Sequence, residues 1–148
     1  MTLIHTPMRI FSILALAFLL KLSGAGWGTD FEDAKKKADK EHKMILLNFS
    51  GSDWCGPCIQ MHKKIFESDA FKAYANDHLV LVNADFPRLK KNQLSKDQQK
   101  KNDKLAEKYD SEGVFPYTLL LNSDGKVQKS WRGYVPMSGD EFVNQLKN

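Results

Sequence analysis

The sequence has 148 residues, of which 42% are hydrophobic and 27% are charged, a balance typical of a globular domain. Nine glycines, five prolines and the absence of any internal repeat exclude collagen-like and solenoid architectures, and a net charge of +4 does not indicate a nucleic-acid-binding protein. Two cysteines are too few for a disulfide-stapled framework or for a zinc site of four cysteines. The length and the composition predict a single domain.

The first residues have the pattern of a secretory signal peptide. Ile10–Leu20 is an apolar run between two basic residues, shorter than the roughly 20 residues that a membrane span needs. Small residues at Ser23 and Ala25 predict cleavage after Ala25, so we interpret residues 1–25 as the signal peptide and 26–148 as the mature domain. An uncleaved segment that tethers the protein to a membrane is the alternative. We expect a periplasmic or secreted protein, whose net charge falls by two after cleavage.

The mature part begins with a helical pattern that leads into a strand. Thr29–Glu32 has the spacing of a capping box, and Phe31, Ala34 and Ala38 share one face of the lysine-rich stretch that follows. Met44–Phe49 is a nearly continuous apolar run, which is typical of a central strand that is buried on both faces.

Helical and strand patterns then alternate. Cys58–Tyr74 is predicted as a helix that can restart at Ser68, and Leu79–Val82 is predicted as a second buried strand. Ser95–Tyr109 suits a helix. Eight Lys or Arg residues lie between Arg88 and Lys108, and we interpret this run mainly as a solvent-facing helix, with a docking surface for an acidic partner as the alternative.

A hairpin and a last helix complete the chain. Tyr117–Leu121 and Lys126–Arg132 flank the turn-rich residues Asn122–Gly125, so an antiparallel hairpin is expected. Ser138–Glu141 is a second capping box and opens a helix that carries Phe142 on its apolar face. This order predicts an α/β domain with a central mixed sheet and helices on both faces.

The chemistry of the sequence lies in Trp54-Cys55-Gly56-Pro57-Cys58, directly after the most apolar strand and at the start of a helix. Two cysteines with this spacing can close a small disulfide ring, and the helix N-terminus favours the thiolate of the first. We therefore predict that Cys55 attacks a substrate disulfide and that Cys58 resolves the mixed disulfide. Pro57 suits the first helical turn, and Gly56 permits the close approach.

This motif, the strand before it and Val114–Tyr117 resemble the thioredoxin family over residues 29–147. The turn Ser50–Cys55 is similar in particular to that of small secreted thioredoxin-like proteins of bacteria. The resemblance implies a thioredoxin fold and an oxidoreductase that exchanges electrons with protein dithiols and disulfides.

The resemblance also implies roles for residues outside the cysteine pair. Pro116 should form a cis peptide and lie against the cysteines, where the backbone of Phe115 can hydrogen-bond an extended substrate. Trp54 should cover the site, and Gly133 should line the substrate groove. Trp54, Phe115 and Pro116 are therefore the predicted substrate-binding residues.

Two features depart from the thioredoxin pattern. Asn48 stands where the family commonly buries an aspartate, and Leu81 or a neighbour stands in place of its lysine partner. Because an amide cannot act as a base, deprotonation of Cys58 would depend on water or on Asp53. The connection from Pro87 to Lys104 is also longer and more basic, and the sequence suggests no purpose for it beyond a longer surface loop.

We predict a thiol-disulfide oxidoreductase that works in the reducing direction, because Gly56-Pro57 resembles the pair in reducing thioredoxins. It should need no cofactor and bind no nucleic acid, and nothing indicates an obligate dimer, so a monomer is expected. In an oxidising compartment it would need a membrane electron donor.

The alternative is a binding module. Cys55, Cys58 and His62, one turn further along the helix, could form part of a copper or zinc carrier, or the Phe115-Pro116 groove could serve a chaperone-like protein. We assign no metal site, because a zinc site would need a fourth ligand.

Overall fold

The computed structural model describes residues 24–148, so the predicted signal peptide lies almost entirely outside the described residues. Within this part of the chain no helix is both long and apolar enough to cross a membrane. The elements in chain order are β1 (Trp27–Gly28), α1 (Phe31–Glu41), β2 (Met44–Ser50), α2 (Gly56–Met61), the π-helical turn η1 (His62–Phe66), α3 (Asp69–His78), β3 (Leu79–Asp85), the 3-10 turn η2 (Lys90–Asn92), α4 (Lys96–Tyr109), β4 (Tyr117–Leu121), β5 (Val127–Arg132) and α5 (Gly139–Lys147).

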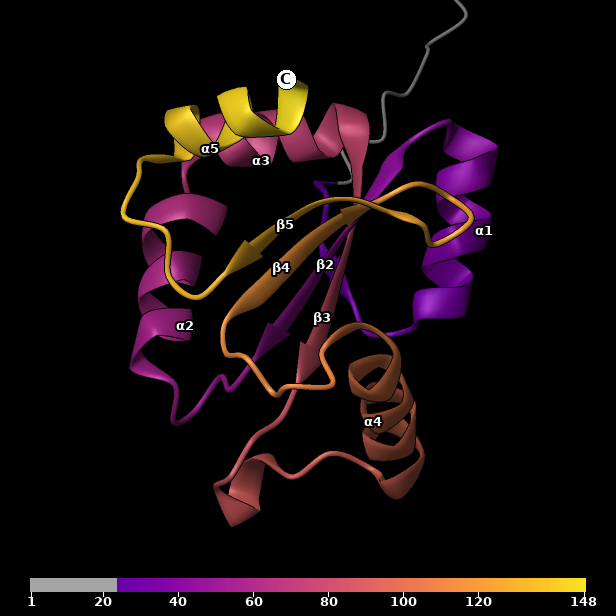
Figure 1. The fold of residues 1–148 in the computed structure, drawn as a ribbon, viewed down its shortest axis with the longest axis vertical. Helices are drawn as coiled ribbons and strands as arrows, with labels where there is room; N and C mark the ends of the chain where they lie inside the picture. Colours follow the sequence, from indigo (N-terminus) through magenta and orange to yellow (C-terminus); the bar gives the residue numbers. More distant parts are fainter. Residues whose placement is uncertain (1–23) are drawn as a thin grey trace, which may run out of the picture.

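The sheet has the strand order β1-β3-β2-β4-β5 (Figure 1). The apolar strand β2 pairs in parallel with β3 and antiparallel with β4, so the predicted central strand and mixed sheet are confirmed. The predicted hairpin is also present as β4 and β5. The two-residue strand β1 pairs in parallel with β3, with Trp27 opposite Leu81. It was not expected, because two residues carry no periodic pattern.

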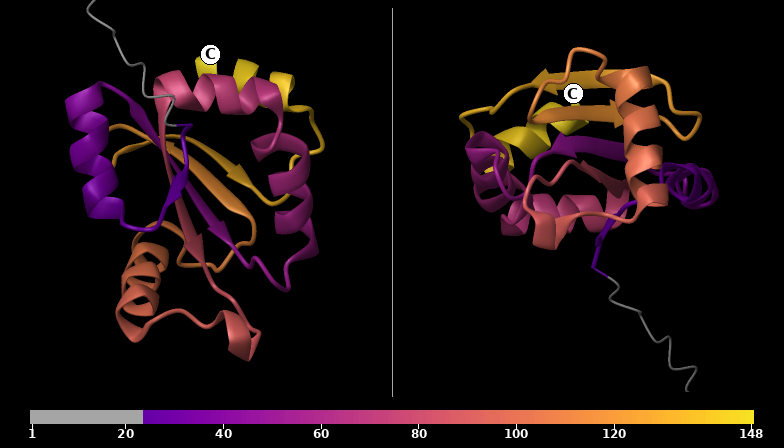
Figure 2. Two further views of the ribbon diagram at one scale, coloured as in Figure 1. Left: turned by 180° about the vertical axis from the view of Figure 1, so that it is seen from behind. Right: turned by 90° about the horizontal axis from the view of Figure 1, so that it is seen from below.

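Helices cover both faces of the sheet, as predicted (Figures 1 and 2). Alternate side chains of β2 point to opposite faces: Ile45 and Leu47 join the core beneath α1 and α4, whereas Leu46 joins the core beneath α2, α3 and α5. By the same alternation Asn48 faces the second layer, which includes the helix that carries the cysteines. The strand pattern thus places one buried amide behind the redox motif.

The helix starts follow the sequence with one correction. Ser138 and Glu141 form the predicted capping box of α5. At α1, however, the N-cap is Asp30, whose side chain accepts a hydrogen bond from the Asp33 backbone N–H at 3.0 Å, so the box expected from Thr29 was wrong by one residue. Aspartate caps a helix as well as threonine does, and here it is the residue whose extended backbone directs its side chain to the first turn.

The helix predicted over Cys58–Tyr74 is broken into three pieces, which corrects the sequence interpretation. The regular helix α2 ends at Met61, and η1 leads to Ser68, where the predicted restart is confirmed. The Ser68 hydroxyl donates to the Ile65 carbonyl at 2.6 Å and accepts from the Phe71 N–H at 3.2 Å. One hydroxyl thereby ends η1 and caps α3. The helical spacing of the apolar residues alone does not reveal this break.

Candidate active site

The two cysteines lie in the first turn of α2, immediately after the turn that follows β2. Cys55 is the N-cap, and its Sγ accepts a hydrogen bond from the Cys58 backbone N–H at 3.2 Å. The two sulfurs form a disulfide, and the cysteines are only 4% and 5% exposed. Because the N–H groups of the first turn point at Cys55, the helix end favours negative charge on that sulfur once the pair is reduced.

The loop before β4 forms a second part of the site. The Phe115-Pro116 peptide is cis, as the resemblance implied. The Pro116 carbonyl accepts a hydrogen bond from the Gly133 N–H at 2.8 Å, and Gly133 has a positive φ of 78° that favours glycine. Gly133 therefore fixes the backbone beside the cis-proline.

A buried carboxylate holds this loop from the other side. Asp110 caps α4 and is 4% exposed, and its Oδ1 accepts a hydrogen bond from the Val114 N–H at 2.9 Å. Its Oδ2 has no hydrogen-bond partner within the described part of the chain, and burial raises the pKa of Asp110. The sequence analysis missed this residue, because Asp110 lies in a turn-like stretch where aspartate is common.

Trp54 lies between the cysteine turn and the cis-proline loop. Its indole N–H donates to the Phe86 carbonyl at 2.7 Å, and its ring meets the edge of Phe115 with 5.5 Å between centroids. A Cβ on Gly51 would lie 2.3 Å from the Trp54 ring, so this ring position requires glycine beneath it. Trp54 is thus fixed by contacts from three separate segments.

Asp53 does not face Cys58. Its carboxylate accepts hydrogen bonds from the Arg88 and Leu89 N–H groups, each at 2.9 Å, and from the Asn92 amide at 3.0 Å. The Arg88 hydrogen bond, with those of Asn92 and Leu89, lowers the pKa of Asp53. The interpretation of Asp53 as a proton acceptor for Cys58 is therefore wrong, because this carboxylate fastens the basic connection that follows β3.

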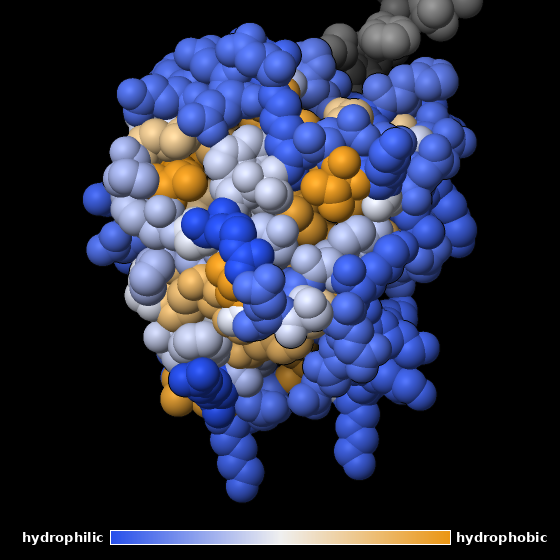
Figure 3. Space-filling model, viewed as in Figure 1, coloured by the Kyte–Doolittle hydropathy of each residue, from blue (hydrophilic) through white to orange (hydrophobic). Residues whose placement is uncertain are grey.

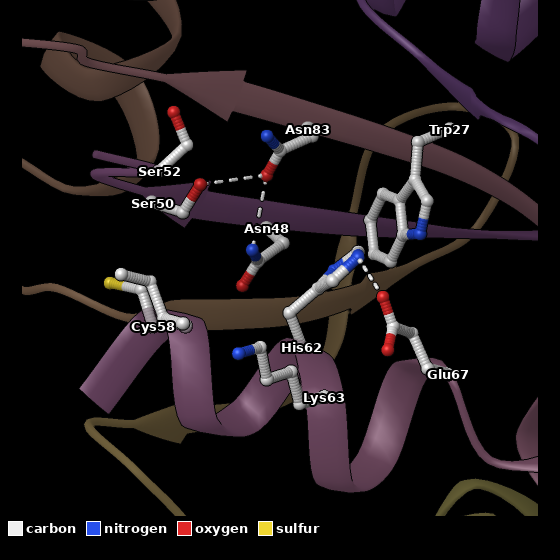
Figure 4. Close-up of a pocket in the computed structure, with 10 residues that line it drawn as sticks. Trp27, Asn48, Ser50, Ser52, Cys58, His62, Lys63, Glu67 and Asn83 are labelled. Atoms are coloured by element: carbon white, nitrogen blue, oxygen red, sulfur yellow. Dashed lines mark hydrogen bonds and ion pairs between the residues drawn. The ribbon is translucent and has the colours of Figure 1, made fainter. Parts of the chain in front are cut away.

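A cavity of about 280 Å³ lies beside Cys58 and is shown in Figure 4. Behind it the Asn48 amide donates to Asn83 Oδ1 at 3.1 Å and accepts from the Thr118 hydroxyl at 2.9 Å. The Ser50 hydroxyl also donates to Asn83 Oδ1, at 3.1 Å. The partner of Asn48 is thus Asn83, its neighbour in the parallel register, rather than Leu81. All four polar groups are uncharged.

His62 does not join the cysteines. Its Nε2 lies 3.4 Å from Glu67 Oε1, and its ring packs near Trp27, on the side away from the Cys58 sulfur (Figure 4). Among residues 24–148 no three His, Cys, Asp or Glu side chains are grouped closely enough to hold a metal ion. The ligand set considered for a metal carrier is therefore not assembled in this structure.

A family model described as a thioredoxin-like domain matches residues 31–148. The chain belongs to the thioredoxin-like family. It is 36% identical over 118 residues to the disulfide bond reductase DsbH of Chlamydia pneumoniae, a match that covers 80% of this chain and 69% of DsbH. A solved structure of a DsbH oxidoreductase superposes with a TM-score of 0.76 at 33% identity and covers 84% of this chain and 83% of its own. A poplar thioredoxin h, at 18% identity and a TM-score of 0.52 over 82% of this chain and 91% of its own, shows the shared fold.

These findings agree with the chemistry of the site. The thioredoxin-like chain carries a Cys55–Cys58 disulfide at a helix N-terminus beside a cis-proline loop, and it is a thiol-disulfide oxidoreductase. The predicted fold and reaction class are therefore confirmed. The sequence analysis missed two residues of the site: Asn83, which is hydrogen-bonded to Asn48 and Ser50 beside Cys58, and Asp110, which accepts a hydrogen bond from the cis-proline loop.

Proposed function

We propose that this oxidoreductase is a reductase of protein disulfides. The Cys55 thiolate attacks a substrate disulfide, forms a mixed disulfide and releases one substrate sulfur as a thiolate. The Cys58 thiolate then attacks the Cys55 sulfur, which releases the second substrate sulfur and closes the Cys55–Cys58 disulfide. Two electrons pass from the protein to the substrate, and the two substrate thiolates take up the protons that the two cysteines lost. No cofactor takes part in these steps.

The geometry supports this order of attack. Cys55 Sγ faces the N–H groups of the first helical turn. Pro57 lies in that turn, where its lack of an N–H group costs no helical hydrogen bond. Gly56 and Pro57 are both exposed, so a substrate can approach the ring that they form with the cysteines. Cys58 lies one turn along, on the side of the buried amides.

Substrate binding is assigned to the surface around the disulfide. An extended substrate segment would run along the backbone of Phe115 beside Pro116, with Trp54 covering the sulfur under attack. Phe115 and Trp54 contact each other, so both act on the same stretch of substrate.

The reducing direction rests on the Gly56-Pro57 pair between the cysteines. This pair resembles reducing thioredoxins, and a relative that is 36% identical is named a disulfide bond reductase. With residues 1–25 as a signal peptide, cleaved or retained as an anchor, the protein would work in the periplasm or outside the cell. A reductase there must be recharged, and a membrane electron donor is the partner that this redox balance requires. The protein itself would act as a monomer.

Trapping tests the mechanism. Cys58→Ser is expected to accumulate mixed disulfides with reducible protein substrates, and Cys55→Ser is expected to abolish exchange. Adducts would be resolved by non-reducing electrophoresis and identified by mass spectrometry, with the double variant Cys55→Ser/Cys58→Ser as the control. Activity that persists in Cys55→Ser, together with no adducts in Cys58→Ser, would refute the assigned roles.

Equilibration of residues 26–148 with dithiothreitol or glutathione tests the direction. A potential near the roughly −270 mV of thioredoxin supports a reductase. A potential near the roughly −120 mV of a strong periplasmic oxidant would overturn the reducing direction while leaving the oxidoreductase chemistry intact.

A further inference from the structure

Residues 86–94 form a basic segment between β3 and the start of α4. It contains Arg88, Lys90 and Lys91 and no carboxylate. The segment lies at the lower end of the molecule in Figure 1, the end at which α2 begins, and hydrophilic side chains project from that end in Figure 3. Three basic side chains without a carboxylate among them therefore lie at the end of the molecule where the helix of the cysteines begins.

Hydrogen bonds hold the basic segment against residues 51–58, the turn that carries the two cysteines and that we call the redox turn. The Phe86 carbonyl accepts the Trp54 indole N–H at 2.7 Å, and Asp53 accepts the Arg88 and Leu89 N–H groups at 2.9 Å each. Trp54 and Asp53 directly precede Cys55 in the chain. The position of the segment relative to the attacking sulfur is thus fixed by hydrogen bonds.

The Arg88 guanidinium lies over the indole ring of Trp54. Its central carbon is 3.5 Å from the ring centroid, which is close cation–π contact. Within the described residues Arg88, Lys90 and Lys91 form no ion pair. The exposed Arg88 guanidinium therefore lies on the ring of Trp54, next to Cys55, and no carboxylate forms an ion pair with it.

The nearby carboxylates reduce this charge but do not pair with it, because Arg88, Lys90 and Lys91 carry three positive charges and Asp53 and Asp85 carry two negative ones. Asp53 is occupied by its three donors, and Asp85 accepts the Ser52 N–H at 2.8 Å and its hydroxyl at 2.5 Å. Both carboxylates are turned to backbone and hydroxyl donors of the fold. Of these charges, the Arg88 guanidinium is the one that lies over the Trp54 ring, beside the cysteine turn.

We propose that the basic segment is a substrate-recognition surface, and that Arg88 selects disulfide substrates with Asp or Glu beside the cysteine under attack. The proposal rests on the proposed function, because a chain that lies along Phe115 to reach Cys55 also passes the Trp54 ring on which Arg88 lies. Lys90 and Lys91, in the turn η2 of the same segment, add two further positive charges. Charges arranged in this way mainly raise the rate of productive encounter and discriminate between partners.

Three synthetic peptides test this specificity. They share one disulfide-closed loop and carry Asp, Ser or Lys on each side of both cysteines, and the reduced protein is mixed with each in a stopped-flow experiment. We expect the Asp peptide to be reduced about tenfold faster than the Lys peptide at low salt, with the ratio shrinking at 1 M salt, where the Debye length is about 3 Å. To remove differences in intrinsic reactivity, each rate is divided by the rate of the same peptide with dithiothreitol.

Arg88→Glu is expected to bring the Asp-to-Lys ratio to about one or below it. Lys147→Glu is the matched control, because it makes the same charge change in the last turn of α5, at the opposite end of the molecule (Figure 1). This control should keep the wild-type ratio. Arg88→Lys, which keeps the charge, should also keep most of it even if removal of the guanidinium changes how Trp54 packs.

The outcomes separate this inference from the proposed function. If the wild-type protein reduces none of the three peptides, the proposed function fails. If it reduces all three at equal normalised rates, or if Arg88→Glu retains the wild-type ratio, the function stands and the recognition surface is refuted. If Arg88→Glu slows all three peptides so far that no ratio can be measured, the ratio in Arg88→Lys decides: a retained ratio supports the surface, and a ratio of one refutes it.

Discussion

The two sides of the redox turn differ in how they carry charge. Behind Cys58, the side chains of Asn48, Asn83 and Ser50 satisfy one another as neutral donors and acceptors. In front of Cys55, Asp53 and Arg88 carry full charges at the surface. One turn of helix therefore separates an uncharged interior from a charged exterior.

This difference reflects where a charge can be stabilised. A buried ion needs an opposite charge or several hydrogen bonds, and the hydrogen-bonded group of Asn48, Asn83, Ser50 and Thr118 contains no charged side chain. The charged Lys63 and Glu67, which line the same cavity, are exposed. Asp53 obtains two backbone N–H donors and one amide donor at the surface. The fold thus keeps neutral buried side chains beside Cys58, which loses a proton in the proposed mechanism, and charged groups at the surface where we propose that substrates are selected.

Asn48→Asp would break this separation and should have the largest effect. The new carboxylate would be buried, and the Thr118 hydroxyl is the donor that already faces this position. Because one hydroxyl donor does not offset the burial of a charge, we expect the free energy of unfolding to fall by about 2–4 kcal/mol at neutral pH. Burial would raise the pKa of the new carboxyl, so the loss should be recovered as the pH falls through that value. Urea denaturation at pH 5 and at pH 8 measures both effects.

The control for this variant is Asn144→Asp on the exposed face of α5, which should change the free energy of unfolding by less than about 0.5 kcal/mol. Equal stability of Asn48→Asp and the wild-type protein at pH 8 would show that the interior accommodates a charge after all.

Gly51→Ala acts on the boundary between the two sides. The added Cβ would lie 2.3 Å from the Trp54 ring, and the hydrogen bond to Phe86 prevents the ring from moving without loss. We expect the free energy of unfolding to fall by about 1–3 kcal/mol, with slower reduction of substrates and a changed near-UV circular dichroism spectrum. Gly26→Ala, whose Cβ would meet nothing within 4 Å, is the matched control. An unchanged spectrum in Gly51→Ala would mean that Trp54 does not depend on this glycine.

Much of the buried side could be predicted from the sequence. The apolar run Met44–Phe49 identified the central strand, and the cysteine motif after it identified the start of a helix. Both inferences depend on local patterns, in which burial and capping are visible in consecutive residues. The caps at Ser68 and Ser138 were found for the same reason.

The rest depends on contacts between distant residues. Asn83 became the partner of Asn48 through the register of two parallel strands, which lie 35 residues apart in the chain. The basic segment is placed by Asp53, again across 35 residues, and a single aspartate in a turn does not show which donors it will meet. Long-range register and the direction of a side chain are therefore what the sequence patterns left undetermined.

Asp53→Asn would loosen the charged side and should have a smaller effect than the two preceding variants. Hydrogen bonds hold the pKa of Asp53 below its usual 3.8, so its ionised form stabilises the fold above that pH, and this contribution is lost as the pH falls through the lowered value. The difference in unfolding free energy between wild-type protein and variant should therefore shrink as the pH falls below 3.8.

Hydrogen exchange provides a local measurement of the same variant. The Arg88 and Leu89 amides should exchange faster, and selectivity for acidic peptides should weaken as the basic segment loosens. Asp103→Asn, exposed on α4, is the control and should leave both amides unchanged. Unchanged exchange at Arg88 and Leu89 in Asp53→Asn would show that the segment is held by other contacts.

His62→Ala should have the smallest effect, because His62 lies on neither side of this charge separation. Its side chain is 50% exposed and its partner Glu67 is 52% exposed, so loss of the pair should change the free energy of unfolding by less than about 1 kcal/mol. The rate of disulfide exchange should stay within about twofold of the wild-type rate, a change of less than half a kcal/mol in the barrier. Equilibrium dialysis with zinc and copper completes the test. Stoichiometric binding that is lost in both His62→Ala and Cys55→Ser would restore the metal-carrier alternative, since the ring would then have turned from Glu67 towards the cysteines.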